Sequence, residues 1–402
     1  MAHKTMRGAN GGGNIRKRSD GRWEARYTTG IDTKTGKQIQ KSVYGKTQKE
    51  VRQKLTEVTA EIDDGTYLEP TRMTVAEWLE IWLSEYMWDK KYSTVKHYKA
   101  TCKANIIPII GNYKLAELKP YMLQKYFNDL FRGTNNVTAH ASKTVHNIHG
   151  ILCKALNQAV MNELIKSNPA SRVTLPRMTR KDIIPLTDAQ IAVFLQLVEK
   201  DEYCALLKTI LFTGMRESEA IGLTWDCIDF EKGTIRLYRQ LQKRPLADGG
   251  FTFETLKNGK ERMLTPAPSV LEVLKKRKIQ QMEQRFAAGA AWQGFQTTRE
   301  QGKALVFTTL TGSNLSPQTV YNHFKKIAVK AGAATATVHD LRHTYVVLSI
   351  QNGDDIKTVQ DNVGHATASF TLDVYGHVSA KMKKDSADRM ENYIKQIKAS
   401  AV

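Results

Sequence analysis

A basic stretch punctuated by proline divides this chain and argues against a single continuous domain. It runs from Pro169 to Pro185 and separates two segments that each show clear apolar periodicity. Proline fixes its own φ and disfavours helix in the preceding residue, so such a stretch is typical of an interdomain linker. We place the linker at residues 175–185. At roughly 150 residues per domain, the 402 residues are expected to form two or three domains.

The net charge of +20 is a second constraint, and it concerns the partner of the protein. Hydrophobic residues make up 41% of the chain, which is enough for folded cores. So large a positive excess favours a polyanionic partner, with nucleic acid ahead of a membrane surface. No apolar run approaches the length of about 18 residues that spans a bilayer, so we expect no transmembrane segment. The first 13 residues lack an apolar signal core, so secretion is not indicated.

The cysteines indicate a reducing compartment. They are Cys102, Cys153, Cys204 and Cys227, and none belongs to a Cys-x-x-Cys pair. Zinc knuckles and a disulfide framework are therefore disfavoured. We expect each cysteine to be a small buried side chain.

Residues 1–70 are expected to form a small α+β module with a three-stranded sheet and one helix. Strands are predicted at residues 14–18, 22–29 and 38–44, and a helix from Thr47 to Asp63. The apolar positions of the sheet, expected to face this helix, are Trp23, Ala25, Tyr27, Ile39 and Val43.

The same module carries a concentrated positive charge. Between Met1 and Lys49 there are twelve lysines and arginines against three acidic residues. If the helix covers one face of the sheet, the other face is polar and basic, which suits insertion into a DNA groove. A solvated basic surface is the alternative. The residues expected to contact DNA are Arg16, Lys17, Arg18, Arg22, Arg26 and Lys41.

Residues 71–174 are expected to form an all-α module. Thr74 and Glu77 have the spacing of a capping box, and residues 142–165 place an apolar stripe on one helix face. A group of lysines is equally suited to phosphate contacts and to a solvated face. These are Lys90, Lys91, Lys96, Lys99 and Lys103.

Two fragments of the last region place arginines at helix starts. An apolar helix ends at Gly214 and a new helix begins near Arg216, where free backbone N–H groups favour anions. Glu219, three residues further on, is placed to orient Arg216. His339 and Arg342 share a face at the start of another helix, and a guanidinium can grip a phosphate with two parallel hydrogen bonds.

A zinc site is an alternative for the second fragment. His339 and His343 are four residues apart, as on a zinc-binding helix, but Asp340 stands where the usual glutamate would follow. Arg342 adds a fixed cation on the same face, which opposes a divalent metal. We expect His343 to be a buried, hydrogen-bonded histidine instead.

Lys257 follows a strand-like run and precedes a strong turn signal. Residues 251–256 and 261–264 are predicted to pair as a hairpin around Asn258-Gly259, because both turn residues tolerate positive φ. Lys257 would then lie at the edge of a tight turn. An exposed lysine in a turn carries little information by itself.

Further on, Gly364 ends a helix and is followed by His365, with Tyr375 ten residues later. A short helix is expected between residues 369 and 374. Taken alone, a tyrosine after an apolar helix is usually a packing residue.

Taken in order, these fragments resemble the tyrosine recombinase (phage integrase) family. The resemblance covers residues 186–380 closely and the preceding modules more loosely, and the layout is most similar to integrases of conjugative transposons. It implies an arm-binding domain at residues 1–70, a core-binding domain at residues 71–174 and a mixed α/β catalytic domain at residues 186–380.

The resemblance also implies the chemistry. Tyr375 would attack a backbone phosphate and form a 3′-phosphotyrosine bond, which conserves the energy needed for resealing. Arg216 and Arg342 would neutralise the transition state, and His365 would donate a hydrogen bond to it. Lys257 would protonate the leaving 5′-hydroxyl. His339 would assist proton transfer at the nucleophile or the phosphate, and no cofactor or metal is expected.

The implied partners are double-stranded DNA, at core and arm sites, and further subunits in a synaptic tetramer. An excision accessory factor is an optional further partner, and no membrane partner is expected. Residues 381–402 are expected to form a tail helix that packs on its own domain or docks on a neighbouring subunit. The expected location is the bacterial cytoplasm, on DNA.

Two other functions remain open at this point. A type IB topoisomerase uses the same chemistry but relaxes supercoils as a monomer. A DNA-binding regulator without catalysis would need the basic module but not the ordered set of fragments.

Overall fold

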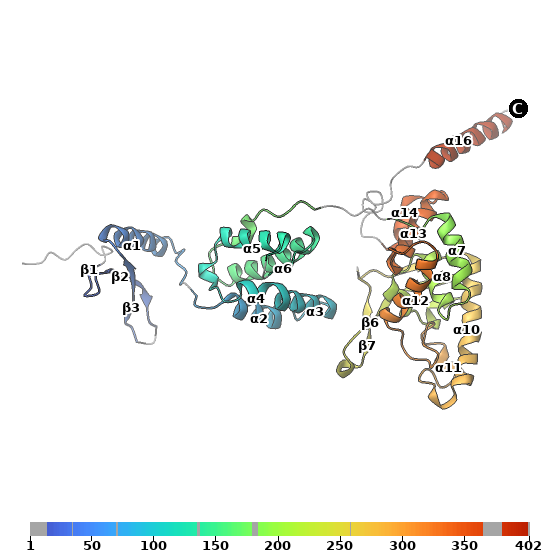
Figure 1. Cartoon of the computed structure of the whole chain (residues 1–402), viewed down its shortest axis with the longest axis horizontal. Helices are drawn as coiled ribbons and strands as arrows, with labels where there is room; N and C mark the ends of the chain where they lie inside the picture. Colours follow the sequence, from blue (N-terminus) through green and yellow to red (C-terminus); the bar gives the residue numbers. More distant parts are fainter. Residues whose placement is uncertain are drawn as a thin grey trace, which may run out of the picture. The chain divides into compact units, whose positions relative to one another are not determined.

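A computed structural model of the whole chain gives the fold in two compact units, Met1–Arg180 and Lys181–Val402. Most of their elements are labelled in Figure 1. The structure describes residues 14–364 and 380–400, except residues 34, 70, 135–136, 179–183 and 258. Within these described ranges, no helix combines the length and the apolar character needed to cross a membrane.

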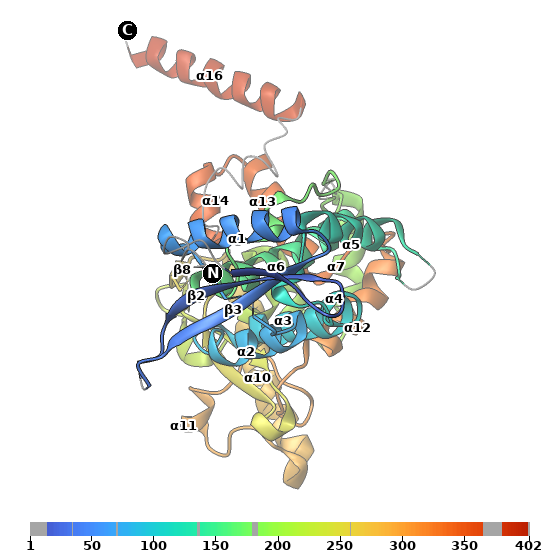
Figure 2. The ribbon, with the colours of Figure 1, turned by 90° about the vertical axis from the view of Figure 1, so that its left-hand side faces the viewer.

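The first unit begins with an antiparallel sheet that one helix covers. In order, the elements are β1 (Asn14–Lys17), β2 (Trp23–Ile31), β3 (Gln38–Gly45) and α1 (Gln48–Asp63). Helix α1 lies against the sheet (Figure 2), with Ala25 buried against Val51 and Leu55. Trp23, Tyr27 and Val43 pack against this cluster, as predicted.

Ile39 departs from the expected inward orientation. Its side chain is 43% exposed. The pairing of β2 with β3 is irregular between Thr28 and Gly30, so Ile39 pairs with Gly30 beyond the regular alternation.

The rest of the first unit is helical and has its own core. Its helices are α2 (Val75–Glu85), α3 (Tyr92–Thr101), α4 (Ile107–Ile110), α5 (Pro120–Arg132) and α6 (Ser142–Met161). The predicted capping box of Thr74 and Glu77 starts α2. Trp78 then ties α2 to α6, because its indole Nε1 donates to the carbonyl of Ala155 at 2.8 Å.

The second unit packs helices around two small sheets. Its helices are α7 (Asp188–Val198), α8 (Cys204–Thr213), α9 (Glu217–Ile221), α10 (Pro268–Ala288), α11 (Thr298–Gln301), α12 (Pro317–Lys330), α13 (Val338–Gln351), α14 (Ile356–Val363) and α16 (Ala380–Ser400). Its strands are β4 (Ile228–Asp229), β5 (Thr234–Leu237), β6 (Arg239–Lys243), β7 (Phe251–Thr255) and β8 (Arg262–Leu264). One sheet has the order β4-β5-β8 and the other pairs β6 with β7.

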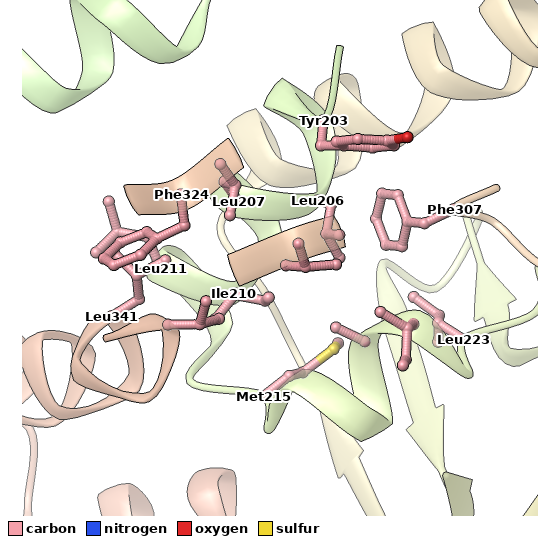
Figure 3. Close-up of a cluster of buried hydrophobic side chains, with 14 of the residues drawn as sticks. Tyr203, Leu206, Leu207, Ile210, Leu211, Met215, Leu223, Phe307, Phe324 and Leu341 are labelled. Atoms are coloured by element: carbon pink, nitrogen blue, oxygen red, sulfur yellow. The ribbon is translucent and has the colours of Figure 1, made fainter. Parts of the chain in front are cut away.

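Helix α8 runs through the core of this unit. Figure 3 shows Leu207, Ile210 and Leu211 of α8 in the same cluster as Phe324 of α12 and Leu341 of α13. All five side chains are completely buried. The core therefore fixes the end of α8 and the start of α13, the two places where the sequence analysis put arginines.

The predicted hairpin around Asn258-Gly259 is wrong. Strand β7 pairs with β6, from Lys243 opposite Phe251 to Arg239 opposite Thr255. Strand β8 pairs instead with β5, in the other sheet. Residues 239–243, for which no strand was predicted, form the antiparallel partner of β7. Lys257 consequently lies in the exposed connection from β7 to β8.

The expected tail helix is present as α16. Its apolar side chains Met390, Tyr393, Ile394 and Ile397 are exposed, at 60%, 58%, 38% and 50% respectively. The short helix expected at residues 369–374 lies outside the described residues.

Candidate active site

Arg216 is held at the start of α9 by buried neighbours. Helix α8 ends at Gly214, whose φ of 65° reverses the chain, and the completely buried Met215 (Figure 3) anchors the next step. Glu219 accepts hydrogen bonds from the backbone N of Arg216 at 3.0 Å and from its Nη1 at 2.7 Å. The predicted orienting role of Glu219 is thus matched by a direct contact.

Glu219 also contacts a second arginine that the sequence analysis did not single out. Arg262 of β8 donates from Nη1 at 3.1 Å and from Nη2 at 2.6 Å to the two carboxylate oxygens of Glu219. Burial alone would raise the pKa of Glu219, but the hydrogen bonds of Arg262 and the charges of Arg262 and Arg216 lower it to about 2. Glu219 is therefore an anion at neutral pH.

Arg342 lies on α13 and is almost fully buried, with 1% of the residue exposed. Its Nη1 donates to the carbonyl of Gly214 at 2.6 Å, and its Nη2 donates to the carbonyl of Val363 at 2.5 Å. Tyr345 of α13 also approaches Gly214 closely. This approach needs glycine at position 214, because a Cβ there would lie 2.4 Å from the Tyr345 ring. The end of α8 and the start of α13 are thereby joined at the site.

The C-terminus of α14 is bound by three arginines through three consecutive carbonyl oxygens. Arg262 Nε donates to the carbonyl of Asn362 at 2.8 Å, and Arg342 binds the next carbonyl, that of Val363. Arg216 Nη2 donates to the third, Gly364, at 3.0 Å. Carbonyl oxygens at a helix C-terminus carry partial negative charge, so guanidinium groups stabilise this end. We call this group the arginine clasp.

His339 and His343 lie on α13 with their rings in contact, centroids 4.6 Å apart and nearly perpendicular. Burial lowers the pKa of His339, and the charges of Arg342, Arg216 and Lys257 lower it further. Burial is also the main cause that lowers the pKa of His343 to about 4. The imidazole of His343 is therefore neutral at pH 7, and the lowered pKa of His339 favours its neutral form.

The electrostatic environment of His339 also shows which predicted residues lie together. Arg216, Arg342 and Lys257 are all near enough to influence its pKa, although they come from distant parts of the sequence. Four of the six predicted catalytic residues thus converge on one place. The other two, His365 and Tyr375, lie outside the described residues.

The zinc alternative gains no support from the neighbourhood of the histidine pair. Among the described residues, no three or more His, Cys, Asp or Glu side chains gather in a way that could hold a metal ion. The cationic Arg342 also opposes a second positive charge beside His339.

The predicted DNA contacts of the first unit divide between the two faces of the sheet. Arg16 and Arg26 lie on the face away from α1, where they flank Glu24. Lys17 and Lys41 pair with residues that pack on α1, so they belong to the side that the helix covers. Lys41 also forms an ion pair with Glu69. Arg22 lies in the turn after β1, with its Nη2 2.8 Å from a carboxylate oxygen of Asp20.

Glu24 organises the uncovered face of the sheet. Its carboxylate accepts hydrogen bonds from Ser42 and from Arg16, both at 2.8 Å, and has ion pairs with Arg18 and Arg26 at 3.6 Å. The hydrogen bonds from Ser42 and Arg16 lower its pKa to about 2. One acidic residue therefore gathers three of the six predicted DNA-binding arginines and lysines.

Arg262 was detectable in principle. It alternates with Met263, which is 56% exposed, and shares its strand face with Leu264, which is 3% exposed. An arginine on an inward strand face requires a buried acid or carbonyl partner. Residues 261–264 were predicted only as one strand of a hairpin, so Arg262 was not predicted to be part of the site.

Comparison with known proteins identifies the family. Residues 185–382 match the model of the phage integrase family, and residues 74–131 match the model of the phage integrase N-terminal SAM-like domain. The chain belongs to the phage integrase family, the tyrosine recombinases that cut and rejoin DNA through a bond to a tyrosine. The first match includes positions 365 and 375.

Relatives and solved structures agree with this assignment. A "tyrosine recombinase XerC-like" protein of Caldanaerobacter subterraneus subsp. tengcongensis is 27% identical over 381 residues, covering 91% of this chain and 94% of its own. The Tn1549 transposon integrase in complex with a circular intermediate DNA has a TM-score of 0.63 at 20% identity, covering 79% of this chain and 99% of that one. Lambda integrase, solved as a tetramer bound to a Holliday junction, has a TM-score of 0.55 at 16% identity, covering 89% and 96%.

Proposed function

We propose that Tyr375 is the nucleophile of a site-specific DNA integrase whose active site is built on Arg216 and Arg342. The observation that carries this proposal is that Arg342 and Arg216 bind the consecutive carbonyls of Val363 and Gly364, with His339 on the same helix as Arg342. Cleavage forms a bond from the Tyr375 oxygen to phosphorus and breaks the bond from phosphorus to the 5′ oxygen of DNA. The reverse attack by another 5′-hydroxyl rejoins the strand, so the energy of the bond is retained.

The arginines supply the charge that this step needs. Negative charge grows on the non-bridging phosphate oxygens in the transition state, and fixed guanidinium groups stabilise it without rearranging. The hydrogen bonds at Gly214 and Gly364 hold Arg342 and Arg216 in place. We assign His365 as a further hydrogen-bond donor to the same oxygens, by its position directly after the arginine clasp.

Two residues are assigned to proton transfer. A phenol has a pKa near 10, so Tyr375 must lose its proton as it attacks. The lowered pKa of His339 favours its neutral form, and a neutral imidazole can accept a proton at the nucleophile or the phosphate. Lys257, exposed on the β7–β8 connection, is assigned as the acid that gives a proton to the leaving 5′ oxygen.

We propose the following domain limits and DNA contacts. Residues 1–70 bind arm DNA, residues 71–174 bind core DNA, and residues 186–380 carry catalysis, with residues 175–185 as the linker. Each of the three proposed domains has its own buried hydrophobic residues, which supports these limits. Within the first module we assign the arm contact to the Glu24 face, with Arg16, Arg18 and Arg26.

The assembly and the biological setting are proposals of the same kind. We infer a synaptic tetramer on DNA, as in the lambda integrase structure, in which residues 381–402 dock on a neighbouring subunit. The exposed apolar side chains of α16 support that docking. The Tn1549 likeness supports integration and excision of a mobile element, with an excision factor as an optional partner. We propose that recombination takes place on DNA in the bacterial cytoplasm.

A nicked suicide duplex tests the proposed function. The duplex carries the element–chromosome junction, located by footprinting, and its nick lets the cleaved end diffuse away so that the covalent adduct accumulates. Wild-type protein should form the adduct, and Tyr375→Phe should bind the duplex equally well without forming it. An undiminished adduct in the variant would refute the assignment of Tyr375. Relaxation of supercoiled DNA without strand exchange would favour the topoisomerase alternative.

A further inference from the structure

Arg262 is the one member of the arginine clasp to which the proposed chemistry gives no role. Its Nε, Nη1 and Nη2 all donate to oxygens of the protein, those of Asn362 and Glu219. It connects three distant segments: β8, where it resides, α9 through Glu219, and the end of α14 through the carbonyl of Asn362. Two of these segments lead directly to residues assigned to catalysis.

Glu219 is shared between two guanidinium groups in a defined way. One carboxylate oxygen accepts from Arg216 Nη1 and Arg262 Nη1, at 2.7 and 3.1 Å. The other accepts from the backbone N of Arg216 and from Arg262 Nη2, at 3.0 and 2.6 Å. Four donors in a fixed arrangement leave the carboxylate little freedom to rotate, so its direction toward Arg216 depends on Arg262.

The charge balance depends on Arg262 as well. Glu219 is buried, with 1% of the residue exposed, so its negative charge acts strongly on its neighbours. With Arg262 in place, one carboxylate balances two cations, and Arg216 retains positive potential toward a phosphate. Without Arg262, the same anion would face Arg216 alone and cancel much of that potential.

We propose that Arg262 is a positioning residue for DNA strand cleavage. Through Glu219 it sets the direction and the electrostatic field of Arg216, and through Asn362 it fixes the end of α14, two residues before His365. The inference rests on the proposed function of Arg216 and extends it to a residue that does not touch the substrate.

The test compares Arg262→Met with a matched arginine on the neighbouring strand. Arg236 of β5 also pairs with a glutamate, Glu261, at 2.7 Å, but both side chains are more than half exposed. The assay is the single-turnover rate of adduct formation on the nicked duplex at saturating protein. Arg262→Met should slow cleavage roughly 10- to 100-fold, by analogy with the loss of a side chain that orients a metal ligand. Duplex affinity should change less than about threefold. Arg236→Met should leave both unchanged, and Arg262→Lys should recover part of the rate.

A substrate with an uncharged group at the cleaved position distinguishes a positioning role of Arg262 from general damage to the fold. A methylphosphonate at the cleaved position removes one charged non-bridging oxygen, so it needs less help from Arg216. The ratio of the rates on phosphate and methylphosphonate DNA should fall about tenfold in Arg262→Met, as expected when a charge-stabilising donor is weakened. Partial unfolding would lower both rates equally and leave this ratio at the wild-type value, because both substrates report on the same folded fraction.

The outcomes distinguish this inference from the function on which it rests. An adduct formed at the wild-type rate by Arg262→Met, or an unchanged substrate ratio, would overturn the positioning role while leaving the proposed function intact. If wild-type protein and Arg236→Met both failed to form an adduct, the proposed function itself would fall, and the inference with it.

Discussion

Replacement of Gly214 by alanine should destabilise the second unit and disturb Arg342. Gly214 has a φ of 65°, and a Cβ would lie 2.4 Å from Tyr345 Cδ1 and 2.9 Å from Val363 Cγ1. The left-handed conformation costs about 1–2 kcal/mol for a residue with a Cβ, and overpacking in a buried place costs about 1–3 kcal/mol more. The total of roughly 2–5 kcal/mol should lower the Tm of a unit of this size by roughly 4–20 °C.

Gly332→Ala provides the matched control in a thermal melt of the full chain. Gly332 has a φ of 74°, but no heavy atom of the described residues lies within 4 Å of the added Cβ. It should therefore lose only the backbone part, about 1–2 kcal/mol. Gly214→Ala should also slow cleavage at 25 °C, because the displaced carbonyl binds Arg342 Nη1, whereas Gly332→Ala should not. Equal shifts in Tm for the two variants would refute the steric argument.

Two further predictions concern the arm module and the histidine pair. Arg16→Ala should weaken arm-DNA binding and reduce by about 1 the slope of log affinity against log salt concentration. Lys41→Ala, on the helix-covered side, should change neither the affinity nor the slope. Fluorescence anisotropy titrations at several salt concentrations compare the two variants, and equal losses of affinity would contradict the assigned face. Burial lowers the pKa of His343 to about 4, so the folded state binds fewer protons than the unfolded state. The contribution of His343 to folding stability is therefore full above pH 6.5 and is lost as the pH falls through 4. An NMR titration of His343 with a midpoint near 6.5 would contradict the lowered pKa that its half-buried position predicts.

Local signals in the sequence were sufficient where the structure is set by neighbours along the chain. The Thr74–Glu77 capping box is present, and helices end at Gly214 and Gly364, as predicted; both glycines are left-handed. The alternation in β2 also predicted its packing against α1. In each case a hydrogen bond or a steric preference acts over a few residues.

Local signals failed where strands had to choose among partners. The Asn258-Gly259 turn signal favoured pairing of β7 with β8. In the structure β7 pairs with β6, and β8 pairs with β5. Ile39 does not face inward, because the pairing of β2 with β3 is irregular between Thr28 and Gly30. The alternation within β3 alone does not predict this irregularity. The partners of Arg262 could not be predicted from local signals, because Glu219 and Asn362 lie 43 and 100 residues away.

The arginine clasp has a consequence for the order in which the protein becomes active during folding. Its bonds to Asn362 and Gly364 join residues 100 and 148 positions apart in sequence, and closing such long loops is slow. The three carbonyls can be bound together only after β8, α9 and α13 have each reached their native places. A growing or partly folded chain therefore contains the modules that we propose to bind DNA before it has a finished cleavage centre, so it is expected to occupy DNA without breaking it.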